Sequence, residues 1–547
     1  MKDKIQDQLT FLYGGNISAR LFEQTQDLLN QYRPRIKSRN GTLTERDAML
    51  ITYGDQVQAP DEMPLQTLKA FCDKYLTDVL SSIHILPFYP WTSDDGFSVV
   101  DYRQIDPALG EWASVSSMQN FRLMFDGVIN HISSQSEWFQ KFLQDDPHYK
   151  YYFITIEGDP DLSQVVRPRA LPLLTSFKTP SGEKKVWTTF SADQIDLNFK
   201  NPDVLLEILD ILLLYIERGA TFIRLDAIAY MWKELGTTCI HLPQTHAVIQ
   251  FLRAAMDEAA PHVQLITETN VPHPDNISYF GDGTNEAQLV YNFALPPLTL
   301  HTFHTGDARI LSAWAKTLTL PSDKTTFFNF LASHDGIGLN PARGILSDAE
   351  IDSLVNKVIE HGGLISYKHN ADGTQSPYEM NINYFDALSN PNGNEPLELQ
   401  VSRFIAAQSI MLSLIGVPGI YFHSLFGSCG WIEGVKQTGR NRTINREKLQ
   451  FDELQGQLAD KNSLRYKVFT RYSQLLNTRS ASSAFDPHGT QVIHDLHPAV
   501  FAVERISPDG KSRRLCLHNV SRIAVSFSVN EKQLSLEPYQ AFWLKTT

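Results

Sequence analysis

Short apolar segments recur along the chain, each followed by a stretch with helical spacing, and this alternation constrains the fold more than any other feature. Eight segments follow the pattern, at 49–55, 82–88, 123–130, 222–229, 263–270, 289–296, 327–335 and 418–424. Eight strand–helix units are the number found in a (β/α)8 barrel. A doubly wound open sheet remains possible on this pattern, although no glycine-rich phosphate turn follows the first segment. We predict the α/β class, with a (β/α)8 TIM barrel as the main body.

The uneven distances between these segments predict where extra domains lie. The third and seventh segments are each followed by a stretch too long for an ordinary connection between strand and helix. After about residue 480 the sequence changes to short alternating runs, which are typical of antiparallel strands. The predicted organisation is an N-terminal helical extension at 1–45, the barrel at 46–131, 200–335 and 396–479, an inserted B subdomain at 132–199, a B' lid insertion at 336–395 and a C-terminal antiparallel β domain at 480–547.

Charge and cysteine content exclude several classes of partner. The formal net charge is -13, which argues against a nucleic-acid or anionic-membrane surface. The most apolar long run, at 204–219, contains Glu207 and Asp210 and is shorter than a bilayer span. The N-terminus carries charges where a secretory signal needs an apolar core. The four cysteines lie far apart without a CxxC pair, so we expect reduced thiols and a cytoplasmic protein with no nucleic-acid or membrane partner.

Three carboxylates, Asp226, Glu268 and Asp335, are placed at the ends of predicted barrel strands. Carboxyl ends of barrel strands converge on one mouth, where barrel enzymes hold their active sites. One such carboxylate by itself is more commonly a helix cap or a salt-bridge partner. Three at one mouth favour catalysis. Arg224 lies on the same face of its strand as Asp226, so we expect it to lower the pKa of that aspartate.

Transfer of a sugar at its anomeric carbon requires such a set of groups. One carboxylate acts as nucleophile, and one carboxylic acid protonates the leaving oxygen. A third can hold the sugar hydroxyls and stabilise the developing positive charge.

Several longer motifs resemble those of a known family. The blocks LMFDGVINH, FIRLDAIAY, LITETN and FLASHDGIG are similar to the signature blocks of the α-amylase superfamily, glycoside hydrolase family 13. The segments LPFYPWTSDDGFSVVDY, RPRALP, SPYEMNINYFDAL and GRNRTINRE resemble its sucrose phosphorylase subfamily. The resemblance covers nearly the whole chain, and it implies a retaining glucosyl transferase on a barrel.

The resemblance also implies roles for individual residues. It makes Asp226 the nucleophile, Glu268 the general acid and base, and Asp335 the transition-state stabiliser. Seven further residues match the family's glucose-binding positions, namely Asp94, Phe97, His131, Arg224, Tyr230, His334 and Arg442. Their closed pocket implies a single glucose unit rather than a polymer. Taken singly, His131 could be a core histidine, Arg442 a domain-interface ion pair and Phe97 plain core.

Acceptor recognition is predicted to lie in the two insertions. Arg169 and Tyr378 match the phosphate-handling residues of sucrose phosphorylases. This chain has Glu379 where those enzymes carry a glutamine, and Arg343 has no counterpart in them. An exposed arginine in a lid is more often a solvated charge, whereas one that points inward would suit an anionic leaving group. These departures resemble glucosylglycerate phosphorylases, so we expect phosphorolysis of 2-O-α-D-glucosyl-D-glycerate to α-D-glucose 1-phosphate and glycerate.

Other activities remain open at this stage. Sucrose, sucrose 6-phosphate and glucosylglycerol are alternative substrates. A hydrolase or transglucosidase would keep the same carboxylates, whereas a non-catalytic sugar-binding protein would be expected to lack one or more of them. The resemblance implies no metal and no other cofactor, with an α-glucoside and inorganic phosphate as small-molecule partners. Monomer and homodimer are both compatible with the sequence.

Overall fold

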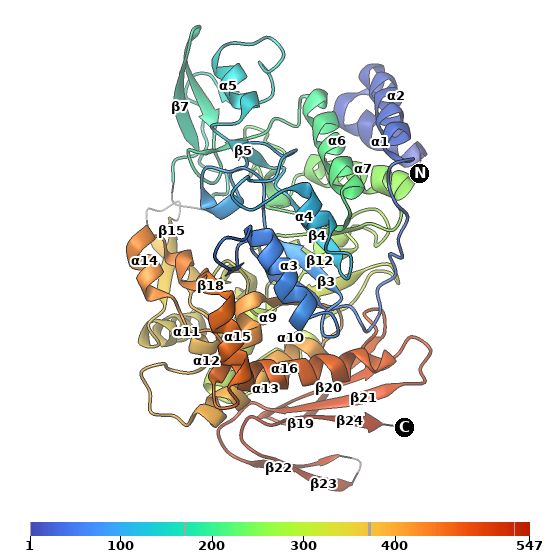
Figure 1. Ribbon diagram of the computed structural model, residues 1–547. Helices are drawn as coiled ribbons and strands as arrows, with labels where there is room; N and C mark the ends of the chain where they lie inside the picture. The colour runs from blue at the N-terminus through green and yellow to red at the C-terminus, as the bar shows by residue number, and fades with distance from the viewer. Residues whose placement is uncertain (1, 169–170, 370–373, 530, 547) are drawn as a thin grey trace.

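A closed parallel barrel forms the centre of the protein. The computed structural model describes residues 2–168, 171–369, 374–529 and 531–546. Within these residues, eight parallel strands close into a barrel in chain order (Figure 1). They are β1 (Met49–Thr52), β3 (Ser82–Ile85), β4 (Arg122–Gly127), β10 (Ala220–Leu225), β11 (Gln264–Thr267), β12 (Leu289–Tyr291), β13 (Thr326–Asn329) and β17 (Val417–Tyr421). Each lies within or overlaps a segment predicted from the sequence, so the barrel prediction is confirmed and the open sheet is excluded.

Helices between the strands cover the outside of the barrel. The principal ones are α3 (Pro64–Tyr75), α6 (Pro202–Glu217), α7 (Pro243–Ala259), α9 (Leu295–Thr305), α13 (Leu397–Ser413) and α16 (Leu464–Ser480). Shorter helices complete the layer, namely α4 (Trp112–Ser116), α8 (His273–Ile277), α10 (Arg309–Ala315) and α15 (Phe451–Ala459), whereas α14 (Ile432–Thr438) packs against the 3-10 helix at Asn441–Asn445. The eight barrel strands are buried almost throughout, as expected for parallel strands covered on both faces.

Helix α6 illustrates how the local sequence fixes these elements. The Asn201 side chain accepts a hydrogen bond from the Asp203 backbone N–H at 3.1 Å, and Pro202 occupies the first turn. Both features favour a helix start. Gly219 follows the helix with φ of 112°, a conformation that glycine adopts without a steric cost. The chain then enters β10 directly, so the end of α6 sets where the strand that carries Arg224 begins.

The insertion after β4 forms a separate layer above the barrel mouth, at the top of Figure 1. It contains β5 (His131–Ser133), α5 (Glu137–Leu143), β6 (Thr155–Ile156), β7 (Leu174–Thr179), β8 (Gly182–Trp187) and β9 (Gln194–Asp196). Strands β5 and β9 pair antiparallel, with His131 opposite Asp196. This pairing ties the root of the insertion to the end of β4.

The segment after β13 holds a small antiparallel sheet beside the mouth. It contains β14 (Ile337–Gly338), α11 (Asp348–Glu360), β15 (Leu364–His369), β16 (Gln375–Asn381) and α12 (Tyr384–Leu388). The strand order is β14-β16-β15. Strand β16 carries Tyr378 and Glu379, and the 3-10 helix η6 (Asn441–Asn445) packs against it.

Two terminal parts pack against the barrel. Helices α1 (Lys2–Tyr13) and α2 (Gly15–Tyr32) form a hairpin against α6 and α7. At the other end, β19 (Thr490–His497), β20 (Val500–Ile506), β21 (Arg513–Asn519) and β24 (Ala541–Thr546) form an antiparallel sheet, next to the hairpin of β22 (Val525–Val529) and β23 (Lys532–Leu536). The domain boundaries given above stay predictions. A search of the described residues finds no helix both long and apolar enough to cross a membrane.

Candidate active site

The three predicted carboxylates line one narrow cavity at the mouth of the barrel. Asp226 follows β10, Glu268 follows β11, and Asp335 lies in the loop between β13 and β14. The cavity has a volume of about 80 Å³. Seven other predicted site residues line it with them: Asp94, Phe97, His131, Tyr230, His334, Tyr378 and Arg442. Residues from distant parts of the chain are therefore assembled around a space suited to one small ring.

Arg224 lies behind Asp226 and is almost completely buried. Its Nη1 contacts Asp226 Oδ1 at 2.9 Å and also forms a short ion pair with Asp126 of β4. The Asp126 carboxylate in turn lies 2.6 Å from His84 Nε2 on β3. Arg224 Nη2 lies 3.9 Å from Glu268 Oε2. One guanidinium therefore contacts both Asp226 and Glu268, which places these two carboxyl groups close together.

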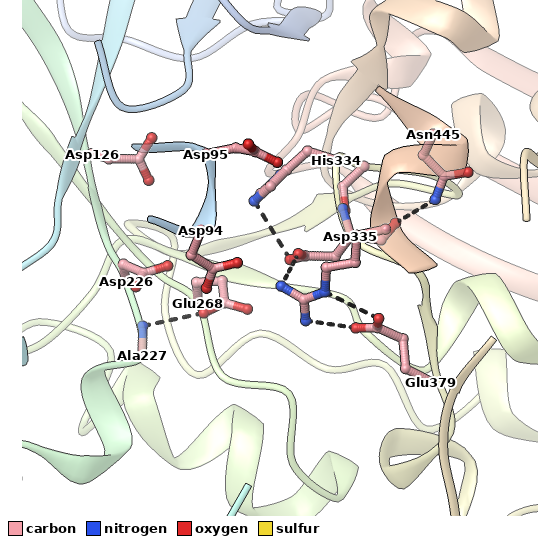
Figure 2. A network of polar contacts seen from close by, with 12 residues as sticks. Asp94, Asp95, Asp126, Asp226, Ala227, Glu268, His334, Asp335, Glu379 and Asn445 are labelled. Atoms are coloured by element: carbon pink, nitrogen blue, oxygen red, sulfur yellow. Dashed lines mark hydrogen bonds and ion pairs between the residues drawn. The ribbon is translucent and has the colours of Figure 1, made fainter. Parts of the chain in front are cut away.

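The backbone after Asp226 connects it to Glu268. Ala227 adopts a left-handed conformation, with φ of 50° and ψ of 32°. Its N–H donates to Glu268 Oε2 at 3.2 Å (Figure 2). The Glu268 N–H donates to the Leu225 carbonyl at 3.1 Å. Left-handed backbone is uncommon for alanine, and such strain is found at functional sites.

Burial raises the pKa values of both Asp226 and Glu268. For Asp226, Arg224 lowers the pKa, but burial and the charge of Glu268 outweigh that effect, and the net shift is well upward. For Glu268, burial likewise exceeds the lowering effect of Arg224. The expectation that Arg224 brings the pKa of Asp226 below its usual range is therefore wrong in net direction. The two groups titrate together, and the direct contact with Arg224 favours Asp226 as the member that is ionised.

Asp335 has the opposite electrostatic environment. Arg442 Nη1 contacts its Oδ1 at 2.6 Å, and His334 Nε2 lies 3.6 Å from its Oδ2. Asn445 Nδ2 donates to its backbone carbonyl at 3.1 Å (Figure 2). Burial would raise the pKa of Asp335, but the nearby guanidinium groups, that of Arg442 first and then that of Arg446, hold it below its usual range. Asp335 is therefore a fixed negative charge beside the other two carboxylates.

Aromatic and imidazole rings form one wall of the cavity. The rings of Phe97 and His334 stack at a centroid distance of 4.8 Å. His131 Nε2 lies 2.8 Å from the Phe97 carbonyl oxygen and 3.2 Å from Gln194 Nε2. Burial lowers the pKa of His334 to about 3, so its imidazole is neutral at physiological pH. Aromatic surface combined with a few placed polar groups is typical of a small-molecule site.

The loop that carries Asp94 has unusual backbone geometry. Asp94, Asp95 and Gly96 have φ values of 55°, 50° and 109°. A Cβ at Gly96 would lie 2.7 Å from the Pro87 carbonyl oxygen, so this position requires glycine. Arg446 pairs with Asp95 and donates from Nε to the His334 carbonyl at 2.8 Å. Arg446 therefore joins the Asp94 loop to the segment that carries His334 and Asp335.

The predicted acceptor residues are placed in different ways. Arg169 lies outside the described residues. Tyr378 lines the inner cavity and also an outer cavity of about 640 Å³. Glu379 lines the outer cavity and pairs with Arg442 through both carboxylate oxygens. Arg343 donates from Nη2 to the Pro377 carbonyl at 3.3 Å, so it contacts the strand that carries Tyr378.

Several residues that shape the site were not identified in the sequence. Asp126 lies inside an apolar strand segment, whereas the sequence prediction considered only the polar residues at strand ends. Asp95, Arg446, Gln194 and Lys233 act through contacts with segments distant in the chain, which spacing does not reveal. The charged residues Asp95 and Arg446 do stand within the motifs TSDDGF and NRTINRE, and that was the available signal.

A buried ammonium group lies behind His131. Lys233 Nζ contacts Asp196 Oδ2 at 2.5 Å and Asn130 Oδ1 at 3.0 Å. The Asp196 carboxylate also accepts from the Thr189 N–H at 2.8 Å. Thus the Lys233 side chain lies between two acceptor oxygens at the root of the insertion. A search of the described residues finds no group of three or more histidine, cysteine, aspartate or glutamate side chains placed to hold a metal ion.

Comparisons with known proteins place this geometry in context. Residues 73–337 match the family described as alpha amylase, catalytic domain. The chain is 50% identical to a glucosylglycerate phosphorylase of Allomeiothermus silvanus, over 100% of this chain and 98% of that protein. It is 44% identical to a glucosylglycerate phosphorylase of Escherichia coli, over 100% of both. A crystal structure of sucrose 6F-phosphate phosphorylase from Thermoanaerobacter thermosaccharolyticum superposes with a TM-score of 0.75 at 26% identity, covering 90% of this chain and 98% of that one.

Proposed function

The chain belongs to the α-amylase family, within the branch of the glucosylglycerate phosphorylases, and from this premise we propose that it is a retaining phosphorylase acting on 2-O-α-D-glucosyl-D-glycerate. Inorganic phosphate takes the glucosyl group, and the products are α-D-glucose 1-phosphate and glycerate. The observation that carries the proposal is the assembly of Asp226, Glu268 and Asp335 around one narrow cavity in a chain that aligns over its full length with phosphorylases.

In the first step, an Asp226 oxygen attacks the anomeric carbon of the bound glucoside. The bond to the glycerate oxygen breaks, and the proton of Glu268 moves to that oxygen. Both carboxyl groups contact the Arg224 guanidinium, which is compatible with the separation of about 5 Å that retaining enzymes use. Glycerate leaves, and a β-glucosyl ester on Asp226 remains.

In the second step, a phosphate oxygen attacks the same carbon from the side that glycerate left. Glu268, now ionised, accepts a proton from the phosphate, and the bond to Asp226 breaks. Two inversions restore the α configuration in glucose 1-phosphate. Asp335, a permanent anion held by Arg442, binds glucose hydroxyls and stabilises the positive charge that develops at the anomeric carbon.

Glucose recognition in this proposal uses the remaining cavity wall. Phe97 and Tyr230 contact the sugar ring, and His131, Arg224 and His334 hold hydroxyl groups or the nucleophile. Asp94 and Arg442 bind the far side of the glucose. The narrow cavity, closed on several sides by these residues, supports one glucose unit rather than a chain of sugars.

Acceptor recognition uses the two insertions. We assign phosphate handling to Tyr378, which lines both cavities, and to Arg169. Arg343 contacts the strand that bears Tyr378, and this supports an indirect role at the acceptor side. The mechanism requires no metal and no cofactor. Free thiols at all four cysteines support a cytoplasmic site of action, and monomer and homodimer both fit the proposal.

A phosphate-dependence assay tests the proposal. Glucosylglycerate, glucosylglycerol, sucrose and sucrose 6-phosphate are incubated separately with and without phosphate, and glucose 1-phosphate and glucose are measured. The proposal predicts rapid glucose 1-phosphate release from glucosylglycerate that depends on phosphate. Free glucose released at the same rate with and without phosphate would contradict it and indicate a hydrolase. Faster phosphorolysis of another glucoside would reassign the substrate.

A further inference from the structure

Glu379 occupies an unusual position for a residue of the acceptor side. It lies on β16 and is 2% exposed. Arg442 donates to its two oxygens, from Nε to Oε1 at 3.1 Å and from Nη2 to Oε2 at 2.7 Å. The remaining terminal nitrogen of Arg442, Nη1, contacts Asp335 Oδ1 at 2.6 Å. The Arg442 guanidinium therefore bridges Glu379 and Asp335, and both of these carboxylates are labelled in Figure 2.

This geometry fixes the orientation of Arg442. A guanidinium is planar, and a carboxylate that fills one of its edges with two parallel bonds sets the direction of the whole plane. The third nitrogen, Nη1, is then held in ion-pair contact with Asp335 Oδ1. Without the bidentate partner, the flexible arginine side chain could turn Nη1 away. Glu379 thereby determines the contact that keeps Asp335 ionised and placed.

The arrangement also explains how a carboxylate is tolerated near an anionic acceptor. An unpaired buried carboxylate would repel phosphate or glycerate and would carry a large desolvation cost. Here the charge of Glu379 is matched by Arg442. Within the described residues, the lining of the inner cavity includes Asp335 and Arg442 but not Glu379, which belongs to the outer cavity lining.

We propose that Glu379 is a positioning residue for glucosyl transfer, acting through Arg442 on Asp335, and that it does not select the acceptor. This inference rests on the proposed function. It separates Glu379 from the acceptor-contacting role that its position beside Tyr378 suggests. The role concerns a step common to every acceptor, because Asp335 serves both formation and breakdown of the glucosyl ester.

The substitution Glu379→Gln addresses the proposal with little change in volume. A glutamine has one oxygen to accept from Arg442, while its amide N–H groups face a second donor, so one of the two bonds is lost. Glucose 1-phosphate serves as the donor, and water, glycerate and glycerol serve as acceptors. We expect kcat to fall on the order of 10- to 100-fold with each acceptor, as for a misplaced catalytic group. The ratio of glycerate to glycerol transfer should stay as in the wild type.

A double-substitution cycle separates a positioning role from an independent one. Arg442→Met removes the group through which Glu379 acts. Adding Glu379→Gln to that variant should then cause no further loss of kcat. The proposal would be overturned if the loss of kcat in the double variant equalled the product of the losses in the two single variants. A changed ratio of glycerate to glycerol transfer in Glu379→Gln would also overturn it. Glu379→Asp, which keeps the charge but shortens the reach, should retain more activity than Glu379→Gln, and equal activity of these two variants would also contradict it.

Two controls keep the outcomes distinct. Melting temperatures of all variants establish that each is folded at the assay temperature. If Glu379→Gln is not folded, kcat is measured with Glu379→Asp. A wild-type protein that does not use glucose 1-phosphate as a donor would contradict the proposed function itself. An active wild type with an additive cycle would contradict the positioning role and leave the proposed function in place.

Discussion

The backbone N–H of Ala227 donates to the Glu268 carboxylate at 3.2 Å, which links the residue after the proposed nucleophile to the proposed acid. Ala227 reaches this position through its left-handed backbone. The two catalytic groups are therefore held by the main chain as well as by Arg224. We therefore expect substitutions and changes of pH at these two groups to have distinct effects on the reaction.

Replacing Glu268 by glutamine should affect substrates according to their leaving groups. Glutamine cannot donate a proton to glycerate, so formation of the glucosyl ester from glucosylglycerate should slow by roughly 10²- to 10⁴-fold. The same step with α-D-glucosyl fluoride, whose leaving group needs no proton, should slow far less. Stopped-flow or rapid-quench measurement of both donors tests this. Equal losses with both donors would exclude Glu268 as the acid, and Glu234→Gln, at an exposed glutamate, is the matched control.

The rate of phosphorolysis should have a bell-shaped dependence on pH. On the acid side the rate rises with pH as Asp226 loses its proton. Burial raises the pKa of Asp226, so this rise should occur at a higher pH than for an ordinary aspartate. On the alkaline side the rate falls as Glu268, whose pKa is also raised, loses the proton it must donate. Asp335 stays ionised throughout, because its pKa is lowered.

The measurement is kcat/KM for glucosylglycerate against pH, with the two apparent pKa values assigned to the coupled pair. The alkaline limb should disappear in Glu268→Gln. A wild-type profile without an alkaline limb would contradict the assignment of Glu268 as a proton donor.

Removing the buried ammonium of Lys233 should destabilise the protein. In Lys233→Met, Asp196 loses its partner while remaining buried, and the free energy of unfolding should fall by about 3–5 kcal/mol. The matched control is Lys200→Met. Its partner is Glu234 at 2.6 Å, and the two side chains are 46% and 49% exposed, so a change of about 0–1 kcal/mol is expected. Urea denaturation measures the free energy of unfolding of both variants. Equal losses would show that the buried pair of Lys233 and Asp196 contributes no more to stability than the exposed pair.

The Tyr378 hydroxyl should affect phosphate more than the glucoside. Tyr378→Phe removes one hydrogen-bonding group where the two cavities meet, and the loss of a bond to a charged ligand raises the KM for phosphate by roughly 10- to 100-fold. Ester formation on Asp226 should change little. Tyr367→Phe, at a half-exposed tyrosine of the outer cavity lining, is the control and should leave this KM unchanged. A slower first step with an unaltered phosphate KM would place Tyr378 on the glucose side instead.

The fold and the proposed catalytic residues were accessible from the sequence because each depends on local pattern. Strand periodicity located the barrel, and polar residues at strand ends located Asp226, Glu268 and Asp335. The direction of the pKa shift of Asp226 was mispredicted. The sequence displays the arginine two positions away but does not display how deeply the pair is buried.

Pairings between distant segments were the other feature that the sequence did not reveal. Glu379 and Arg442 are far apart in the chain, and Asp95 and Arg446 are farther still, so spacing gives no signal for either pair. The sequence placed Glu379 near the acceptor from its neighbour Tyr378. The structure adds that its side chain lies against Arg442, a contact that the neighbouring residue does not reveal. The direction of a side chain on β16 depends on register and packing, which only the assembled structure specifies.

Direct detection of the glucosyl ester tests the proposed role of Asp226 as nucleophile. Wild-type protein and Asp226→Ala are mixed with glucosylglycerate in the absence of phosphate, quenched in acid, digested and analysed by mass spectrometry, with circular dichroism to establish that both are folded. We expect a glucosylated peptide containing Asp226 in the wild type and none in Asp226→Ala. Addition of phosphate should remove the glucosyl group from the wild-type peptide and release α-D-glucose 1-phosphate. A glucosyl group on another residue, or turnover by folded Asp226→Ala at the wild-type rate, would contradict this role.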